Sequence, residues 1–465
     1  MSQPVNRRSI LRAGVAASGV ALGSNWFDFT TVTAAGVVRR DVGNLKATDQ
    51  VFVSYAKAIK AMKALPASNP LSWSYQAAIH GTTASGSYTA WNTCEHGTYF
   101  FWSWHRMYLY WFEKIIRKMS GDYGWALPYW NWSSASERQL PPMFRVTTSE
   151  LYVSQRDPNM NNGTGSLPAS DVDYSVSFGD TGFTQACLYI QGTPHGDVHV
   201  DVGGWMGSVP TAAQDPIFYL HHCNIDRLWN LWLAQGGGRT DPLNDATWKN
   251  TKFTFFDENG AQVQMTGCDV LRAAEQLNYT YEGEPTQVKE YCTRVFRLPF
   301  LFTTALLFQF PVPPITLNEG VVSVPVNLKE MRTRLTSLAV STTETLLLEL
   351  DGVEAEKAPG VVWEVYLGLP ANTEPDPKGP YYAGNVSLFG MGIRSESHHE
   401  FKPATVRLPI GKAVTSWLRT NGDTAALTFV PHGVLVNGKP TRPKALSPVK
   451  IAKASIVVDT KKTQE

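Results

Sequence analysis

The chain has 465 residues, which is too long for one average domain and fits a catalytic domain followed by a second domain. With 43% hydrophobic and 17% charged residues, it can bury a large core. Because 41 Lys and Arg accompany 40 Asp and Glu, no net field attracts nucleic acid or an anionic lipid surface. We therefore expect a small neutral ligand, no nucleic-acid partner and no membrane partner.

Residues 1–35 have the pattern of an export signal. The segment 6–12, Asn-Arg-Arg-Ser-Ile-Leu-Arg, is a twin-arginine motif, and an apolar stretch follows it at 14–22. That stretch is short and contains Gly and Ser, which argues against a membrane anchor. We expect export by the twin-arginine route to the periplasm or the extracellular space.

The next part of the chain, residues 36–283, is predicted to form a mainly α domain, a helix bundle. Apolar residues recur at helical spacing in four segments, which are Asp49–Leu65, Trp73–His80, Tyr99–Met119 and Asp215–Ala234. The third helix is expected to end at Ser120-Gly121. The fourth opens with Asp215-Pro216, an N-cap followed by proline at the first helical position.

The C-terminal part is predicted to be a β-sandwich domain over residues 341–465, after a linker or transition over residues 284–340. Short β-rich runs are separated by Pro and Gly, namely Val295–Phe300, Thr345–Leu350, Val361–Leu367 and Ala426–Phe429. The proline-containing stretch 311–340 is expected to be a linker or an edge segment. The lysine-bearing end 449–465 is expected to fray.

Five cysteines form no CxxC metal pattern. Four of them could form one or two disulfide bonds, or could instead be buried free thiols: Cys187, Cys223, Cys268 and Cys292.

Histidines are the most informative residues of this sequence. Seven of the ten lie in the helical part, in two groups: His80, His96 and His105, and then His195, His199, His221 and His222. His195 and His199 are four residues apart, so on a helix both rings project from one face and can bind one ion. Ligation by nitrogen alone suits Cu, Zn, Ni or Fe and argues against Mg, Ca and Mn. Two matched groups favour a pair of metal ions.

The adjacent pair His221 and His222 cannot supply two ligands to one ion. Neighbouring side chains on a helix point about 100° apart. We expect His222 to be the ligand and His221 to pack behind the ligands. The remaining three histidines, His398, His399 and His432, are expected at the surface or edge of the β domain without a metal role.

Several segments resemble the paired copper-binding signatures of type-3 copper proteins, the bacterial tyrosinases, catechol oxidases (polyphenol oxidases) and haemocyanins. The resemblance spans roughly residues 37–283. It rests on His96-Gly97, Phe101–Arg106, Leu127–Trp132, the run Asp215–Trp229 with Asp226-Arg227, and on the end motifs Val38–Val42 and Tyr279–Tyr281. It implies two copper ions, O₂ as co-substrate, small phenolic substrates, and a copper-delivery partner before export. The implied ligands are His80, His96 and His105 for CuA, and His195, His199 and His222 for CuB.

The same resemblance assigns roles to residues beside the ligands. Cys94 stands two residues before His96, the spacing at which several members form a thioether between cysteine and histidine. Asp226 is expected to orient a ligand ring by accepting its other N–H. Phe218, one helical turn before His222, is expected to form a stacking wall of the substrate pocket, and Val200 beside His199 is a further pocket candidate.

Two departures from the family pattern favour oxidation of o-diphenols to o-quinones, the catechol oxidase reaction. Many members that also hydroxylate monophenols carry an asparagine where this chain has Gly196, and a glutamate where it has Gln191. Glutamine cannot act as a general base. The alternatives are a tyrosinase with monooxygenase activity and a haemocyanin-like oxygen carrier. The β domain is expected either to shield the active site, as in longer members, or simply to stabilise the protein.

Overall fold

The computed structural model describes residues 36–84, 88–284, 301–310, 312–318, 320–339, 341, 344–396, 401–420 and 422–462. Four sequence predictions fall outside these ranges: the export signal 1–35, the strand Val295–Phe300, Cys292, and the pair His398 and His399. Among the described helices, none has both the length and the apolar character needed to span a membrane.

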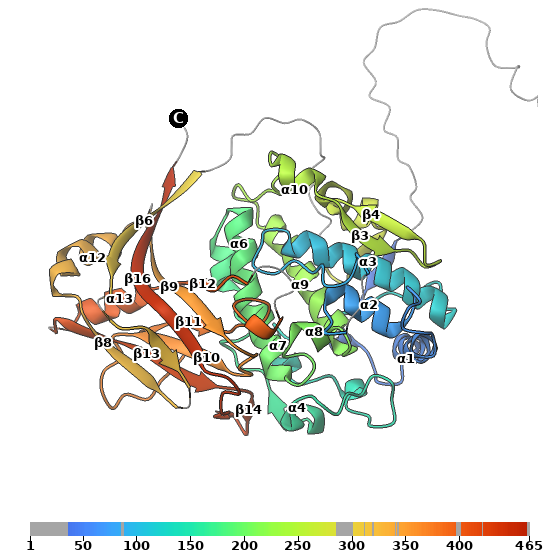
Figure 1. Ribbon diagram of the computed structural model, residues 1–465, viewed down its shortest axis with the longest axis horizontal. Coiled ribbons are helices and arrows are strands. Elements are labelled where there is room, and N and C mark those ends of the chain that lie inside the picture. The colour runs from blue at the N-terminus through green and yellow to red at the C-terminus, as the bar shows by residue number, and fades with distance from the viewer. Residues whose placement is uncertain are drawn as a thin grey trace, which may run out of the picture. The chain divides into compact units, whose positions relative to one another are not determined.

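Helices dominate residues 36–284, coloured blue to yellow-green in Figure 1. The four predicted helices are present as α1, α2, α3 and α9. The helices of this part are α1 (Gln50–Lys63), α2 (Trp73–His80), α3 (Phe101–Ser120), α4 (Pro158–Asn162), α5 (Ser175–Gly179), α6 (Phe183–Ile190), α7 (Asp197–Val202), α8 (Val209–Ala212), α9 (Ile217–Ala234), α10 (Ala246–Asn250) and α11 (Ala273–Gln276). A kinked segment, Gln191–Gly196, joins α6 to α7; its backbone is non-helical at Thr193, and the Thr193–Pro194 peptide bond is cis.

The ends of the long helices follow from their local sequence. Gly121 terminates α3 in the left-handed conformation, at φ 76°, which an L side chain rarely adopts. At the start of α9, the Asp215 carboxylate accepts the Ile217 N–H and also pairs with the buried Arg156. Asp215 therefore accepts a hydrogen bond at the start of α9 and also neutralises the buried Arg156.

Two sheets make up most of the C-terminal part, drawn in yellow to red in Figure 1. One has the strand order β11-β10-β13-β8, and the other has β12-β9-β16-β6 with β7 also paired to β16. The strands are β6 (Leu301–Gln309), β7 (Ile315–Leu317), β8 (Val322–Asn327), β9 (Glu344–Ala355), β10 (Val362–Leu367), β11 (Tyr382–Val386), β12 (Ala404–Pro409), β13 (Thr424–His432) and β16 (Val449–Lys462). Side chains of both sheets and of α12 (Arg332–Ala339) and α13 (Gly411–Leu418) share one hydrophobic core. The protein thus has a helical first part and a strand-rich C-terminal part.

The expectation that residues 449–465 fray was wrong for 449–462. This segment is β16, which pairs with β9, β6 and β7. Ile451, Ile456 and Val458 are buried, whereas Lys450 and Lys453 are exposed, so the lysines occupy the solvent side of an inner strand. Parts of the expected linker are also strands, because β6, β7 and β8 add to the two sheets at 301–327.

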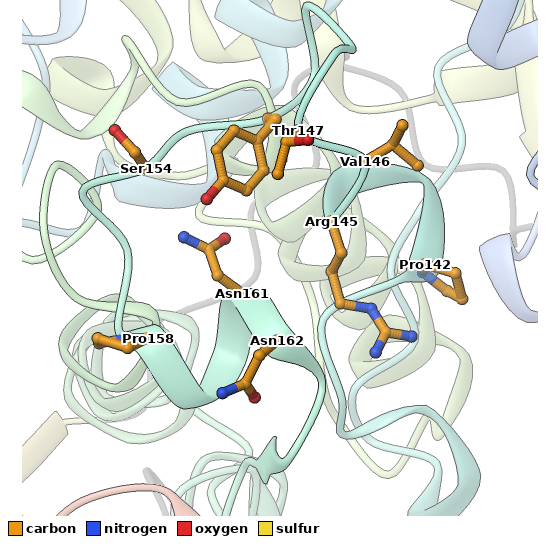
Figure 2. Close-up of a pocket in the computed structure, with 9 residues that line it drawn as sticks. Pro142, Arg145, Val146, Thr147, Ser154, Pro158, Asn161 and Asn162 are labelled. Atoms are coloured by element: carbon orange, nitrogen blue, oxygen red, sulfur yellow. The ribbon is translucent and has the colours of Figure 1, made fainter.

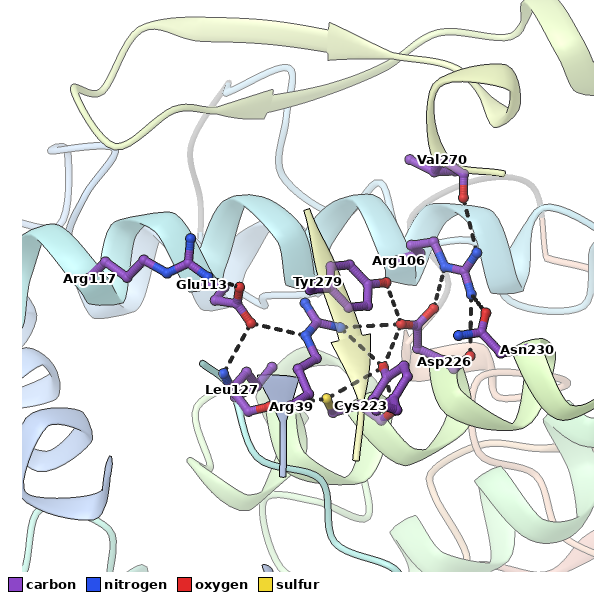
Figure 3. A network of polar contacts seen from close by, with 11 residues as sticks. Arg39, Arg106, Glu113, Arg117, Leu127, Cys223, Asp226, Asn230, Val270 and Tyr279 are labelled. Carbon is purple, nitrogen blue, oxygen red and sulfur yellow. Dashed lines mark hydrogen bonds and ion pairs between the residues drawn. The ribbon is translucent and has the colours of Figure 1, made fainter. Parts of the chain in front are cut away.

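A parallel pairing joins the two ends of the helical part. β1 (Val37–Arg39) lies beside β5 (Tyr279–Tyr281), with Arg39 opposite Tyr281. The Arg39 side chain is fully buried and contacts Glu113 on α3 and Asp226 on α9. Segments that are far apart in sequence are therefore held together by one buried cation, as Figure 3 shows.

A small sheet joins the helical and strand-rich parts. β14 (Leu435–Val436) pairs with β15 (Lys439–Pro440) and with β2 (Gly165–Ser166) of the helical part. The hairpin turn between β14 and β15 contains Asn437 and Gly438, both with positive φ, as a tight turn of this type requires.

Cys94, Cys187 and Cys223 are free thiols, and Cys268 is disulfide-bonded. The option of a disulfide at Cys187 or Cys223 was therefore wrong. Both thiols are buried in the helical core instead.

Candidate metal centre

Six imidazoles from six successive segments converge inside the helical part. His80 is the last residue of α2, His96 lies in the loop before α3, and His105 lies in the first turns of α3. His195 lies in the kinked segment 191–196, His199 lies on α7 and His222 lies on α9. The rings of His105 and His222 stack with centroids 4.3 Å apart. The two groups predicted from the sequence thus lie next to each other.

Backbone carbonyls orient four of these rings. In each case Nδ1 donates a hydrogen bond, which places the proton on Nδ1 and leaves the Nε2 lone pair free for a metal. The pairs are His80 with Val209 O at 3.2 Å, His105 with Phe101 O at 2.9 Å, His195 with Gln191 O at 3.0 Å, and His199 with Met206 O at 2.8 Å.

The Nε2 atoms of the six rings lie close together and are open to a metal. Those of His80, His96, His105 and His195 are buried and have no hydrogen-bond partner among the described residues. Those of His199 and His222 lie 3.2 Å apart, so two lone pairs converge on one point. Buried polar atoms without partners are costly, and a metal ion removes that cost. The residues therefore fit a metal pair.

Burial also keeps these rings neutral. It lowers the pKa of His96 to about 3, and it lowers the pKa of His80 well below the ordinary value of 6.5, an effect that neighbouring imidazoles reinforce. The pKa values of His105, His195, His199 and His222 are lowered for the same reasons. Neutral imidazoles are the form that binds metals.

His221 differs from the six in its hydrogen bonding. The Trp132 indole N–H donates to His221 Nδ1 at 3.1 Å, so the proton of the neutral ring lies on Nε2. His221 belongs to the same group as His195, His199 and His222, but its Nε2 has no lone pair to offer. The tautomer supports the expectation that His222 binds metal and His221 does not.

Separate substitutions of His222 and His221 should distinguish the metal ligand from the packing residue. We expect His222→Ala to lower the bound metal from two ions per chain to about one, because a metal ligand is lost. His221→Phe should keep two ions, since only a packing ring is replaced by another. Metal analysis of the purified proteins measures both values, and equal loss in the two variants would contradict the assignment.

Asp226 does not orient a ligand ring, so this sequence prediction was wrong. Its carboxylate accepts from Arg39, Arg106, Tyr279 and Tyr281, and these four groups occupy its oxygens in place of an imidazole. Burial alone would raise the pKa of Asp226, but Arg106 and Arg39 lower it below the ordinary 3.8. Figure 3 shows this network between α3, α9 and β5. Its role is to hold the helices that carry His105 and His222.

Phe218 lies deeper than predicted. Its ring is fully buried and packs against His80 at 4.7 Å and His222 at 4.2 Å between centroids. It therefore braces ligand rings from the inner side of the site. Val200, the other pocket candidate, is also almost completely buried.

A different phenylalanine covers the ligands from the C-terminal part. Phe389 follows β11 and stacks on His199, with centroids 3.7 Å apart and planes within 6°. It also contacts His96 and His195 edge-on. The next residue, Gly390, lies so close that a Cβ would come within 2.7 Å of the His96 ring. In the sequence, residues 381–389 loosely resemble the shielding domain of longer family members, but nothing there singles out Phe389 as the residue that reaches the site.

Gln191 is fully engaged in hydrogen bonds. Its Oε1 accepts the Gly97 N–H, and its amide nitrogen donates to the carbonyls of Thr98 and Cys187. Gly196, the other position that departs from the expected pattern, faces the C-terminal part, because a Cβ there would lie 2.7 Å from Ser387 Oγ. Both residues thus touch the loops that frame the site.

Cys94 lies against His96, with Sγ 3.3 Å from Nδ1. Burial raises the pKa of the Cys94 thiol, so it is protonated at neutral pH.

His432 is buried, not at the surface as expected. It lies at the end of β13, and its Nε2 is 3.5 Å from the buried Asp171 carboxylate.

A surface hollow of about 540 Å³ lies between the loops around α4 and contains none of the site residues (Figure 2). Its lining is mixed, with Arg145 and Asn161 beside Pro142 and Val146.

Family models match three successive parts of the chain. The common central domain of tyrosinase matches residues 70–187 and 155–235, a range that contains all six convergent histidines. The polyphenol oxidase middle domain matches residues 242–291. The chain belongs to the tyrosinase and polyphenol oxidase family. A domain of unknown function matches residues 314–431 in the strand-rich part.

Known members of the tyrosinase and polyphenol oxidase family resemble the chain over different lengths. Tyrosinase HcTyr1 of Hahella sp. is 37% identical over 299 residues, and the match covers 52% of this chain and 62% of that relative. A chloroplastic polyphenol oxidase of Malus domestica is 27% identical over 83% of this chain and 74% of the relative. The structure of latent apple tyrosinase covers 92% of this chain and 98% of its own, with a TM-score of 0.61 at 24% identity, so the two share a fold.

Tyrosinases and polyphenol oxidases are copper oxidoreductases that bind two copper ions. The donor set described above, with six neutral imidazoles and no carboxylate, suits copper. Phenolic substrates and O₂ fit a member of this family.

Proposed function

We propose that this protein is a polyphenol oxidase that uses O₂ to oxidise o-diphenols to o-quinones. In this proposal, six histidines bind two copper ions. One ion is bound by His80, His96 and His105, and the other is bound by His195, His199 and His222. The convergence of their Nε2 atoms in a buried site carries this proposal. Bound copper supplies one-electron exchange at each ion, which matches the two electrons that a catechol gives up.

The chain's own residues prepare the site for that exchange. Hydrogen bonds from Nδ1 to backbone carbonyls hold four rings in place without adding charge. Packing of Phe218 and Phe101 against the rings excludes water from the inner side. An incoming phenol ring approaches from the side of Phe389 and stacks on His199 once Phe389 has moved away.

Monophenol hydroxylation is disfavoured by the state of Gln191. A general base would have to stand there to deprotonate a phenol, whereas the Gln191 amide is neutral and fully hydrogen-bonded to Gly97, Thr98 and Cys187. We propose diphenol oxidation as the main activity, and tyrosinase activity on monophenols is the second candidate.

Turnover rates measured in parallel on a catechol and on a monophenol test the preference for diphenols. The copper-loaded enzyme should oxidise a catechol at least about ten times faster than tyramine or L-tyrosine, with a difference in activation free energy of about 1.4 kcal/mol or more. Oxygen uptake measures both rates. Conversion of tyramine without a lag and at a catechol-like rate would overturn the preference.

Single substitutions at Gln191 and Gly196 do not cleanly convert the activity. In Gln191→Glu, the carboxylate would face the Thr98 and Cys187 carbonyls, to which the amide now donates. In Gly196→Asn, the new side chain would collide with Ser387 Oγ. We expect Gln191→Glu alone to lower catechol turnover, and Gly196→Asn with Gln191→Glu to raise monophenol turnover only when Ser387→Gly is added. Initial rates on both substrates check this.

The strand-rich part is proposed to shield the copper site. Phe389 occupies the face of His199 that a substrate ring would use, and Asn385 donates to Asp171 and Asp197 of the helical part. We also propose that residues 36–283 form a helix-bundle domain and that residues 341–465 form a domain in which the two sheets make a sandwich. A plain stabilising role is the alternative.

A thioether between Cys94 and His96 is proposed as a modification of the first copper site. Formation of the bond joins Sγ to a ring carbon and removes the thiol hydrogen and one ring hydrogen, hence two protons and two electrons. O₂, the co-substrate, accepts both electrons and both protons and leaves as H₂O₂. The mass of the peptide that contains both residues should be two hydrogen atoms lower than calculated in wild type after copper loading. A full calculated mass would exclude the bond, and Cys94→Ser supplies the unmodified reference.

Export by the twin-arginine route is proposed for residues 1–35, with a copper-delivery partner acting before export. An oxygen carrier is the remaining alternative in function. A protein that binds copper and O₂ but does not oxidise catechol, even with the C-terminal part removed by protease, would favour that alternative.

A further inference from the structure

We infer that Glu396, in the strand-rich part, is a positioning residue for the copper ligands. The inference rests on the proposed di-copper function and extends it, because it gives the shielding segment a second role. Glu396 follows Phe389 by seven residues and ends a short 3-10 helix, Arg394–Glu396. Its carboxylate accepts from Ser208 Oγ at 2.5 Å and from the Val209 N–H at 3.3 Å.

The loop that Glu396 contacts orients one ligand of each copper ion. Within residues 203–209, the Met206 carbonyl accepts from His199 Nδ1, and the Val209 carbonyl accepts from His80 Nδ1. His80 belongs to one proposed ligand set and His199 to the other. A displacement of this loop therefore turns two ligand rings at once.

Val209 is where the carboxylate has most influence. It opens α8, so its N–H has no partner inside the helix and takes the Glu396 carboxylate instead. Its carbonyl holds His80, and close packing against Gly81, where a Cβ would lie 2.6 Å from Val209 O, leaves little freedom. The residue is thus fixed at its N–H by the C-terminal part and at its carbonyl by the ligand.

The Met206 and Val209 carbonyls are the direct hydrogen-bond partners of the ligand rings, and Glu396 acts through the loop that carries both carbonyls. Loss of such a partner typically weakens metal binding roughly 10- to 100-fold. The segment from Phe389 to Glu396 consequently has two opposite effects: the ring of Phe389 blocks the site, while the carboxylate of Glu396 keeps its ligands in place.

Copper retention in the full-length, copper-loaded protein tests the inference. We compare wild type with Glu396→Ala, Glu396→Gln and Arg394→Ala, and measure copper per chain while a copper chelator is titrated in. Arg394 lies on the same 3-10 helix, but it pairs with Glu354 away from the ligands, so it controls for local folding. The glutamine variant can accept from Val209 N–H and donate to Ser208 Oγ, so it should rescue the function.

In Glu396→Ala, the first copper should leave at roughly tenfold lower chelator concentration than in wild type. The half-loaded protein should then show the paramagnetic resonance signal of a single Cu(II). Glu396→Gln and Arg394→Ala should release copper as wild type does. Wild-type retention in Glu396→Ala, or equal weakening in Arg394→Ala, overturns the inference. A wild-type protein that binds no pair of copper ions would instead overturn the proposed function.

Discussion

Replacing Phe389 with alanine should raise kcat/KM for a catechol by roughly 60- to 700-fold. The phenyl ring is 2% exposed and stacks on His199, so the closed state gains about 1.5–3 kcal/mol from its burial and about 1 kcal/mol from stacking. Each 1.4 kcal/mol of stabilisation that the closed state loses makes the fraction of molecules with an open site tenfold larger. Oxygen uptake at low catechol concentration measures the change.

Phe310 offers a matched control for this substitution. It is also 2% exposed, but it lies in the core of the strand-rich part and contacts Phe308. Phe310→Ala should destabilise the strand-rich part without uncovering His199 directly. If Phe310→Ala activates the enzyme as strongly as Phe389→Ala, the site is blocked by the strand-rich part as a whole and not by the Phe389 ring in particular.

Replacing Asp226 with asparagine should lower the free energy of unfolding by about 3–5 kcal/mol. Arg39 and Arg106 are both completely buried, and Asp226 contacts each of them. Without its charge, Arg106 loses its carboxylate partner, and Arg39 keeps only Glu113, which also pairs with Arg117. Because proteins are stable by only about 5–15 kcal/mol, we expect a large fall in melting temperature.

The stabilisation by Asp226 depends on pH in a defined direction. Its pKa is lowered in the folded state, so its contribution is present above the ordinary pKa of 3.8 and is lost as the pH falls below that value. The difference in Tm between wild type and Asp226→Asn should be largest near neutral pH and shrink below about pH 4.

An exposed carboxylate serves as the comparison. Glu150 pairs with Lys63 at 2.8 Å, and both side chains are partly exposed to water. Glu150→Gln should change stability by less than about 1 kcal/mol at any pH. An effect of Asp226→Asn as small as this would mean that water reaches the buried arginines.

The helices that carry ligands were predictable because their signals are local. Apolar spacing places α2 and α3, and Gly121 ends α3 through a backbone conformation that glycine favours. The convergence of the histidines was predictable too, since core packing alone rarely requires two groups of three imidazoles. The choice of His222 over His221 needed only helix geometry, and Trp132 adds the tautomer.

The rest depended on contacts between distant segments. A carboxylate beside an arginine in sequence, such as Asp226, gives no indication of whether it faces a ligand or two buried cations. The lysines made β16 hard to predict, because Lys450 and Lys453 face solvent and give the segment the composition of a tail. Phe389 and Glu396 carry no motif. Their roles arise because β11 delivers the chain that follows it to the ligand rings.

The pairing of β1 with β5 has a consequence for the order of events during synthesis. Arg39 emerges from the ribosome long before Tyr281 and Asp226, yet it needs both to neutralise and enclose its charge. The helical part therefore cannot complete its core until about residue 281 has been made. If residues 1–35 direct export of the folded protein, the signal has to wait for that event, and its removal must leave Val37 in place to keep the pairing.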